Sequence, residues 1–370
     1  MRQREYSGAR SVPQVGIDYG LAYEFVMSLI VFQEMEWKIA SEYEYEIGAA
    51  WYKTVRAKVP SEVQRGLEQF IWQARVGDST SCYSWGVLLG LAYECDPPKD
   101  VPAFMAYLEA LEPLDVFLYL LGYYHRGLRH LLPLDVIVQA AEGDPQMQAQ
   151  YLKTFTGSDP TVEQKLRALF ALEPAALKEM LVDLLWSWYD YVFRDMAQQT
   201  LPILERDAEA KRKLQAAVPF MQLIETATNG LTYAPEPGLR KIVLVPTVIG
   251  RPWNESSEYQ DKTIICYPVA DEFVARDTTV PPVQLVRLYQ ALADERRLRI
   301  LKLLKTRNYT LQEIADEFGV AKSTMYHHLV LLRSAGLVRM RTDEKDYSLR
   351  RETLARVSEL LSSYLDGPPT

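Results

Sequence analysis

The chain has 370 residues, of which 48% are hydrophobic and 24% are charged, and its formal net charge is −8. This composition is typical of a soluble globular protein rather than a disordered chain, and the length is sufficient for two or three domains. No apolar core of signal-peptide length directly follows residues 1–13, and no apolar run approaches the roughly 20 residues of a membrane helix, so we expect a cytoplasmic protein that binds no membrane. The cysteines, Cys82, Cys95 and Cys266, are odd in number and widely spaced, which disfavours a disulfide framework.

Residues 1–230 show a helical pattern almost throughout, punctuated by Pro and Gly. We expect them to form a large helical domain with a sensing or interaction role. The predicted helices are 19–40, 61–76, 83–94, 101–121, 134–142, 145–154, 162–172 and further stretches between 175 and 228. The segment contains no Gly-rich phosphate loop and no repeat of fixed period.

Two short β-branched runs follow at 241–246 and 262–268, each bounded by turn-forming residues. They predict a pair of strands, antiparallel across the loop 250–261. Residues 231–280 are therefore expected to form a small β element and a linker. Val280-Pro281-Pro282 stiffens the junction to the last domain, which we place at 281–370.

The segment 310–338 carries the most specific pattern of the chain, because its spacing predicts two short helices joined by a tight turn. The first helix, about 311–318, has one apolar face and ends at Gly319, a residue that tolerates the left-handed conformation of a helix C-terminus. The second begins near Ala321. Helical spacing places on its inner face Met325, His328, Leu329 and Leu332, and on its outer face Ser323, Thr324 and His327. This is the pattern of a helix-turn-helix that reads DNA.

The flanking residues complete a small domain. Asp294 is placed to cap the helix that runs to Lys305, and Glu295 adds favourable charge to its first turn. After the second helix, 337–341 and 346–349 alternate as two strands around an acidic turn, which predicts a wing. The chain as a whole is thus expected to be mainly α with small β elements: a large helical N-terminal domain plus a C-terminal winged helix-turn-helix.

Five motifs occur in this domain in a fixed order: Ala291-Leu292-Ala293-Asp294, Arg297-Leu298-Arg299-Ile300-Leu301, Ser323-Thr324 with His327-His328-Leu329, Ala335-Gly336-Leu337-Val338, and Tyr347-Ser348-Leu349. In this order and at these intervals they resemble the winged-helix domain of ArsR-type transcriptional regulators, over about 283–365. The L-V-P and Y-P segments before it are similar to those of a subgroup with long N-terminal regions. The resemblance implies binding to double-stranded DNA as a dimer.

The candidate DNA-binding residues are Lys322, Ser323, Thr324, Tyr326, His327, Arg333, Arg339 and Arg341. Two departures from the family pattern bear on them. Ala321 stands where relatives often have a capping Ser, which removes about 1 kcal/mol of capping. The tip of the wing, 343–346, is acidic, so Arg339 and Arg341 on the strand are the better phosphate contacts.

The resemblance also identifies where a metal would bind. Metal-sensing relatives carry a C-x-C pair at the start of the helix before the recognition helix, and this chain has Thr310-Leu311-Gln312 there. The last helix, 351–365, contains no His. Because thiolate and imidazole ligands are missing from both places, we predict no metal site and no cofactor.

Charge is divided unevenly along the chain. Residues 281–370 hold 15 Lys and Arg against 11 Asp and Glu, a net of +4, and residues 1–280 have a net of −12. Only the C-terminal domain therefore suits a phosphate backbone.

Aromatic residues are concentrated before Pro281, where all 7 Trp and 18 of the 23 Tyr lie. They gather at Tyr43-Tyr45-Trp51-Tyr52, Tyr119-Tyr123-Tyr124 and Trp186-Trp188-Tyr189-Tyr191. These groups are compatible with a ligand pocket or a partner surface, because Tyr and Trp join an apolar face to a polar tip. Helical spacing also favours plain core packing.

These observations lead to a hypothesis: a cytoplasmic, homodimeric transcriptional regulator, a repressor, that binds a palindromic operator and responds to a non-metal small molecule through its N-terminal domain. Two alternatives stay open. A protein partner docks on the N-terminal domain instead of a ligand, or an enzyme is fused to a DNA-binding domain. We expect no enzyme, because the sequence has no G-x-S-x-G, H-E-x-x-H or Walker motif.

Overall fold

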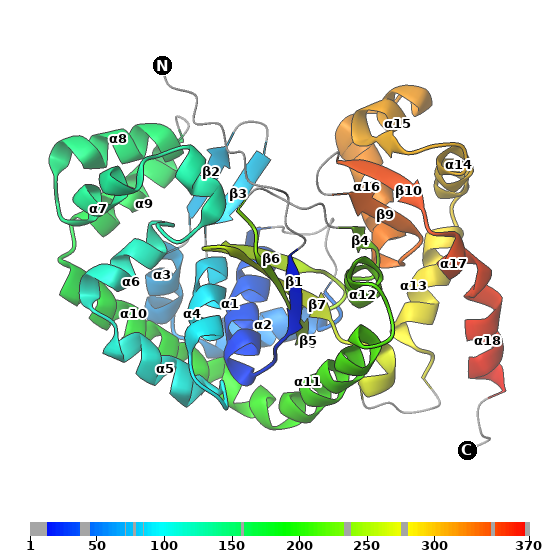
Figure 1. The fold of residues 1–370 in the computed structure, drawn as a ribbon, viewed down its shortest axis with the longest axis horizontal. Coiled ribbons are helices and arrows are strands. Elements are labelled where there is room, and N and C mark those ends of the chain that lie inside the picture. The colour runs from blue at the N-terminus through cyan, green and yellow to red at the C-terminus, as the bar shows by residue number, and fades with distance from the viewer. Residues whose placement is uncertain are drawn as a thin grey trace.

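The computed structural model describes residues 13–37, 45–70, 72–76, 79–83, 85–156, 159–232, 238–274, 280–341 and 345–366. Helices dominate, a four-stranded sheet lies near the middle, and the C-terminal residues form a separate group of elements at one side (Figure 1). The predicted mainly α fold with small β elements is therefore confirmed. Within these described ranges, no helix combines the length and the apolar character that crossing a membrane requires.

The central sheet has the strand order β1-β5-β7-β6. Its strands are β1 (Gln14–Ile17), β5 (Lys241–Thr247), β6 (Glu255–Tyr259) and β7 (Lys262–Pro268). β5 and β7 run parallel, so the antiparallel pairing expected for them is wrong. The reason is the additional strand β6, which forms the antiparallel hairpin with β7 through a tight turn at Gln260, whose φ is 51°. β1 then adds to β5 in parallel.

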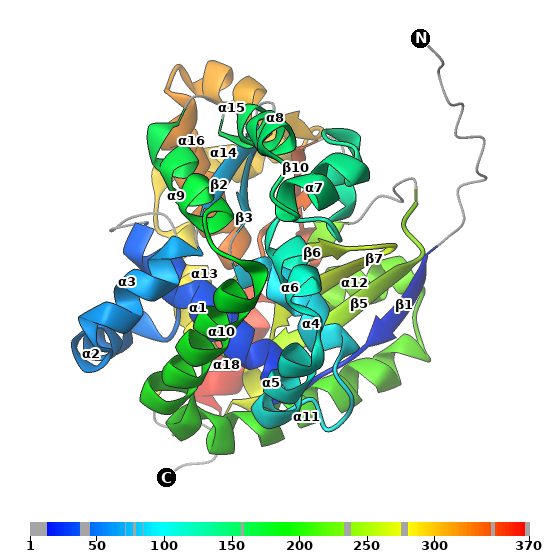
Figure 2. The ribbon, with the colours of Figure 1, turned by 90° about the vertical axis from the view of Figure 1, so that its left-hand side faces the viewer.

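The two inner strands are buried along nearly their whole length, as continuous apolar runs in parallel sheets usually are. Because side chains alternate along a strand, they serve two different cores. Val243, Val245 and Ile264 belong to the large helical core, whereas Ile242 and Ile265 pack with α12 (Phe220–Ala227) on the other face. The strands between 241 and 268 are thus held between helices on both faces (Figure 2).

The first 219 residues supply the helices of the large core. Those before the β2–β3 hairpin (Trp72–Val76 and Ser79–Tyr83) are α1 (Leu21–Trp37), α2 (Gly48–Lys58) and α3 (Ser61–Gln69). Those after it are the 3₁₀ turn η1 (Trp85–Val87), α4 (Leu88–Glu94), α5 (Val101–Ala110), α6 (Pro113–Leu120), the 3₁₀ turn η2 (Arg126–His130), α7 (Leu134–Ala141), α8 (Pro145–Phe155), α9 (Pro160–Phe170), α10 (Pro174–Trp188), the π-turn η3 (Tyr189–Phe193) and α11 (Arg194–Gln215).

Proline sets several of these helix boundaries. α6, α8, α9 and α10 each begin at a Pro, whose missing N–H costs nothing in the first turn of a helix. The single helix predicted over 101–121 is for this reason two helices, since Glu112 before Pro113 is extended. The helix predicted over 61–76 ends at Gln69, and 72–76 form β2 instead.

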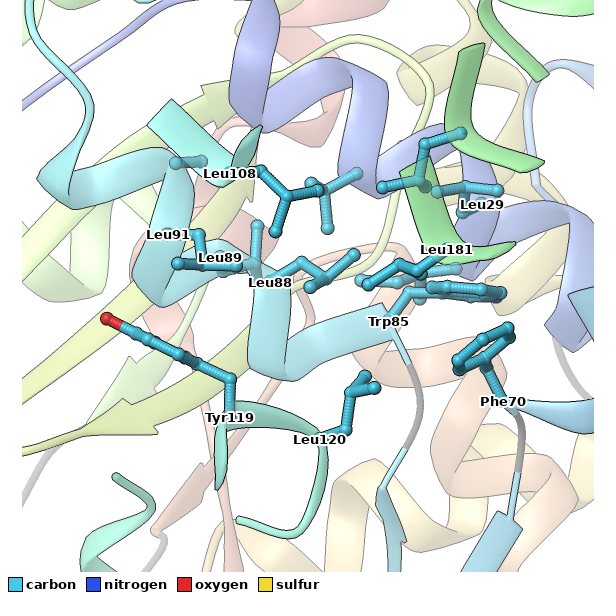
Figure 3. Close-up of a cluster of buried hydrophobic side chains, with 14 of the residues drawn as sticks. Leu29, Phe70, Trp85, Leu88, Leu89, Leu91, Leu108, Tyr119, Leu120 and Leu181 are labelled. Carbon is cyan, nitrogen blue, oxygen red and sulfur yellow. The ribbon is translucent and has the colours of Figure 1, made fainter. Parts of the chain in front are cut away.

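The aromatic residues of the N-terminal region lie largely in the core. Trp85 and Trp188 are almost completely buried, and Trp85 packs among leucines of α1, α4 and α10 (Figure 3). Trp188 also donates a hydrogen bond from Nε1 to Ser28 Oγ at 2.9 Å. Tyr43 of the first aromatic group lies outside the described residues. Core packing therefore accounts for both Trp85 and Trp188.

Glu24 is a fully buried carboxylate in α1 that holds the loop after β5. It accepts hydrogen bonds from the backbone N–H of Val248, at 3.0 Å, and of Ile249, at 2.7 Å. Burial nevertheless raises the pKa of Glu24 to about 7, because the hydrogen bonds offset desolvation only in part. Glu24 therefore binds its proton more strongly in the folded chain than in the unfolded chain.

This raised pKa predicts a pH-dependent stability. The folded chain holds the Glu24 proton up to about pH 7 and the unfolded chain loses it near 4.5, so this group's contribution to the free energy of unfolding falls as pH rises through that window. Melting temperatures at pH 5.5 and 8 measure it, and Glu24→Gln should lose less stability over this interval than wild type. An equal loss in both proteins would contradict the assignment.

Candidate nucleic-acid interface

The C-terminal elements are α13 (Val283–Leu292), α14 (Glu295–Leu304), β8 (Tyr309–Thr310), α15 (Leu311–Phe318), α16 (Lys322–Ser334), β9 (Val338–Arg341), β10 (Asp346–Leu349), α17 (Arg351–Ala355) and α18 (Val357–Leu365). Asp294 caps α14, as predicted, by accepting a hydrogen bond from the Arg297 N–H at 2.9 Å. That bond lowers the pKa of Asp294 below its usual value.

α15 and α16 form the predicted helix-turn-helix. Thr310 and Glu313 make a capping box at the start of α15, and Gly319 ends that helix with φ of +62°. Ala321 begins α16 without a side-chain cap. Ile314 and Ala315 of α15 pack with Met325, Leu329 and Leu332 of α16 in one buried core. The inner faces predicted for both helices are therefore confirmed, except that His328 is only half-buried.

The N-terminal half of α16 is the exposed part. Lys322, Ser323 and Thr324 are exposed, and Tyr326 and His327 are half-buried. His328 lies beside α14, with Nδ1 3.9 Å from Asp294 Oδ1 and Nε2 3.5 Å from Arg296 Nη1. Burial lowers the pKa of His328 below its usual value. Its side chain is 12% exposed, so it contributes little to the exposed face of α16.

The C-terminal half of α16 faces the N-terminal part of the chain. Val330 and Ser334 are buried, and Arg333 and Ser334 line a small cavity with residues 228–231 and 252–254. Arg333 also lies next to the Tyr347 hydroxyl of β10. The structure thus separates Arg333 from the exposed candidates at the other end of the same helix.

β9 and β10 form the predicted antiparallel hairpin. Its tip, 342–344, lies outside the described residues. Arg341 makes two contacts with Asp346, Nε to Oδ1 at 2.7 Å and Nη2 to Oδ2 at 2.5 Å. This fork geometry holds the guanidinium against the hairpin and lowers the pKa of Asp346.

The N-terminal region adds a strand to this hairpin, which the sequence did not indicate. β4 (Leu231–Thr232) pairs in parallel with β9, so the sheet order is β4-β9-β10-β8. Arg339 of β9 contacts Glu225 of α12 at 2.5 Å and Glu352 at 3.2 Å. Arg339, a candidate phosphate contact, is therefore engaged by carboxylates at the junction between the two parts of the chain.

Close backbone packing reinforces this junction. Gly336 follows α16 with φ of +69°, and a Cβ at this position would lie 2.5 Å from Asn229 Oδ1. Asn229 Oδ1 accepts a hydrogen bond from Arg350 Nη1 at 2.8 Å. A second attachment lies on the other side, where α13 meets the loop after β5.

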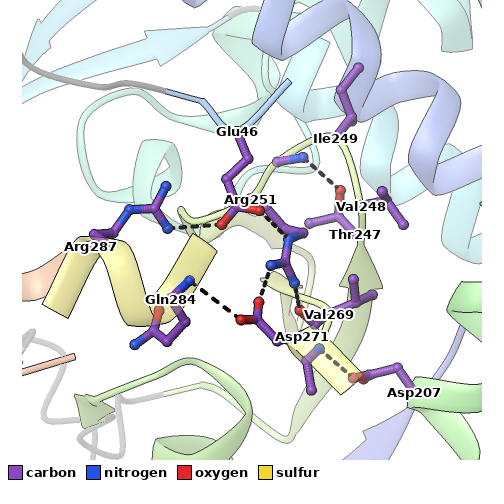
Figure 4. A network of polar contacts seen from close by, with 12 residues as sticks. Glu46, Asp207, Thr247, Val248, Ile249, Arg251, Val269, Asp271, Gln284 and Arg287 are labelled. Carbon is purple, nitrogen blue, oxygen red and sulfur yellow. Dashed lines mark hydrogen bonds and ion pairs between the residues drawn. The ribbon is translucent and has the colours of Figure 1, made fainter. Parts of the chain in front are cut away.

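That second attachment is a network centred on Arg251, which is 5% exposed (Figure 4). Arg251 contacts Glu46 at 2.7 Å and also Asp271. Glu46 in turn binds Arg287 of α13 at 2.8 Å. The backbone N–H of Gln284 in α13 extends the network by donating a hydrogen bond to Asp271 Oδ2 at 3.4 Å. Polar contacts from three distant segments thus fix α13 against the N-terminal part.

Sequence reasoning missed further exposed cations on α14, a helix that packs beside α16. Arg296, Arg299 and Lys302 of α14 are exposed, and Arg296 reaches the His328 ring. Their i, i+3 spacing on one helix was the available signal. With regard to metals, the described part of the chain contains no group of three His, Cys, Asp or Glu arranged to hold an ion.

Comparison with known proteins agrees with this geometry. Residues 294–340 match the family described as bacterial regulatory protein, arsR family. A segment of 51 residues is 35% identical to the transcriptional repressor SdpR of Bacillus subtilis (strain 168); it amounts to 14% of this chain and 57% of that protein. The C-terminal region therefore carries an ArsR-type helix-turn-helix domain, as the sequence motifs indicated.

The capping box makes a local prediction. Thr310→Ala removes the side chain that accepts the Glu313 N–H, so the start of α15 should lose about 1 kcal/mol of stability. Amide hydrogen exchange of 311–318 should then be about fivefold faster. Thr324→Ala, an exposed threonine of α16 with no capping role, is the control. Unchanged exchange in the Thr310→Ala protein would show that the cap does not stabilise the helix.

Proposed function

We propose that the protein is a DNA-binding transcriptional regulator of the ArsR type, and that it has no catalytic activity. The observation that carries this proposal is the exposed N-terminal half of α16 within a segment that matches the arsR family. In helix-turn-helix proteins the second helix reads the major groove with its N-terminal residues. Here those residues are Lys322, Ser323 and Thr324, with Tyr326 and His327 on the next turn.

The charged and the uncharged side chains of this surface suit different parts of the DNA. Lys322 on α16 and Arg296 and Arg299 on α14 are exposed cations that suit phosphate oxygens. Ser323, Thr324 and His327 are uncharged hydrogen-bonding groups that suit base edges. Arg339 and Arg341 are occupied by Glu225 and Asp346, so their part in binding DNA depends on release of those ion pairs.

The reading face can be tested with a double variant. Ser323→Ala with His327→Ala should weaken binding to a duplex selected from a random-sequence pool by about tenfold or more, because base contacts contribute about 1–3 kcal/mol each. A gel-shift titration measures the affinity. Gln198→Ala with Gln199→Ala, two exposed residues of α11, is the matched control. Equal affinity of wild type and the α16 variant would exclude this face.

A homodimer is the assembly that the surface supports. Val283, Val286 and Tyr289 of α13 are 46%, 38% and 40% exposed and, at a spacing of three, lie on one side of the helix. An apolar stripe of this kind is more stable when it is buried against a second copy. A two-fold dimer would present two α16 helices to two half-sites, which makes a palindromic operator the matching target.

The proposed homodimer can be tested by disrupting the stripe and measuring the mass of the protein in solution. Val286→Asp with Tyr289→Asp places two charges on the stripe, so the variant should sediment as a monomer under conditions where wild type sediments as a dimer. Leu201→Asp, on an α11 residue that is 38% exposed, is the control and should leave the mass unchanged. A variant that remains dimeric would place the interface elsewhere.

The N-terminal part is proposed to sense a non-metal ligand and so to control repression in the cytoplasm. What supports a ligand rather than a docked protein is the distribution of exposed apolar groups. In the described N-terminal residues the large ones are Leu131, just after η2, Tyr191 in η3 and Leu201 in α11. A docking site for a protein would need a larger contiguous patch.

A further inference from the structure

A cavity of about 350 Å³ lies where the N-terminal part meets the C-terminal domain. One wall comes from α12, the loop after β5 and the segment after β7. The other wall comes from α13, α17 and α18. This volume falls in the range of small-molecule sites, and the position between two domains is one where such sites are common.

The cavity wall is largely apolar and is built by both parts of the chain. Ala227, Pro252 and Val269 line it from the N-terminal side, and Leu288 and Leu360 line it from the helices of the C-terminal domain. An occupant with an apolar body would therefore lie in van der Waals contact with apolar side chains of both domains at once.

The carboxylates that line the cavity form ion pairs, whereas one of the arginines that line it forms none with the residues that the structure describes. The carboxylates are already engaged: Glu46 by Arg251 and Arg287, Asp271 by Arg251, and Glu352 by Arg339. Arg356 at the same wall is exposed, and its guanidinium has no ion pair or hydrogen bond within the described ranges. The carboxylates of the wall are thus already paired with arginines, whereas Arg356 is available to bind an anion.

Arg350 is the second cation of interest. Its side chain is 13% exposed, and Nη1 donates to Asn229 and to the Gly336 carbonyl oxygen. Its Nε lies 3.5 Å from Glu225 and has no well-aligned hydrogen-bond acceptor in the part of the chain that the structure describes. Burial lowers the pKa of Arg350 from its usual value, although Glu225 lies nearby.

We propose that this cavity binds a small organic anion with an apolar body, whose acidic group lies at Arg356 and Arg350 and whose body lies against Val269, Leu288 and Leu360. That such a ligand regulates DNA binding rests on the function proposed above. Because the ligand would touch both walls, it would bind one arrangement of the two domains better than another. That difference is what a coupling between ligand and DNA requires.

The probe for the site is 8-anilinonaphthalene-1-sulfonate, which joins two apolar ring systems to one sulfonate. Titration of the full chain should show saturable fluorescence enhancement. N-phenyl-1-naphthylamine, the same ring system without the sulfonate, should bind about tenfold more weakly, because a charge-assisted hydrogen bond is lost.

Arg356→Gln should weaken binding of the sulfonate by a similar factor of about ten and leave binding of the neutral probe unchanged. Arg351→Gln removes the same charge from an exposed residue of α17 that does not line the cavity, and it should leave both affinities unchanged. Ala270→Leu, which adds volume to the lining, should weaken both probes. Absence of saturable binding, or a sulfonate affinity that neither Arg356→Gln nor Ala270→Leu alters, would overturn the proposal.

A gel shift with and without saturating sulfonate then tests the regulatory role. A changed affinity for DNA supports the coupling, and an unchanged affinity contradicts it. These outcomes are distinguishable from failure of the proposed function. If the chain binds no DNA, the proposed function fails and the fluorescence titration still decides whether the site exists.

Discussion

Pairing of β4 with β9, held by the contact of Arg339 with Glu225, joins the N-terminal part of the chain to the C-terminal elements. Two residues of strand would be a weak link alone, but Arg350, Asn229 and Gly336 pack around it. The charges of Arg339 and Glu225 are partly removed from water, so loss of one of the two side chains would leave the charge of the other poorly compensated. The network around Arg251 secures α13 on the other side of the cavity.

This attachment divides α16 into two functional halves. Its C-terminal half is covered by residues 228–231 and 252–254, and its N-terminal half stays exposed, with Arg296 of α14 at His328. Any change in the contact between the domains therefore acts on the same helix that is proposed to read DNA. The cavity lies between the β4–β9 contact and the Arg251 network, and it is lined by Asn229 and Arg350 from the first and by Glu46 and Arg251 from the second. No long pathway would be needed to connect the proposed ligand site with the helix that is proposed to read DNA.

Local patterns predicted the C-terminal domain well, because its determinants are local in the sequence. Asp294, Thr310 and Gly319 specify helix ends through neighbouring backbone groups, and helical spacing alone separates Met325 from Ser323. Long-range pairing was beyond this reasoning. The parallel contact of β5 with β7 depends on the intervening strand β6, and the ion pair of Glu225 with Arg339 joins residues 114 positions apart. Arg339 and Arg341 looked available for phosphate because their carboxylate partners could not be assigned from spacing.

Hydrogen exchange of the full chain, with and without a duplex selected from a random-sequence pool, tests the central claim most directly. If the exposed half of α16 reads DNA, the duplex should slow amide exchange in 321–328 and in the exposed cationic stretch of α14, and should leave α4 to α6 unchanged. Protection confined to the N-terminal part, with unchanged exchange in 321–328 while the duplex is bound, would contradict the account.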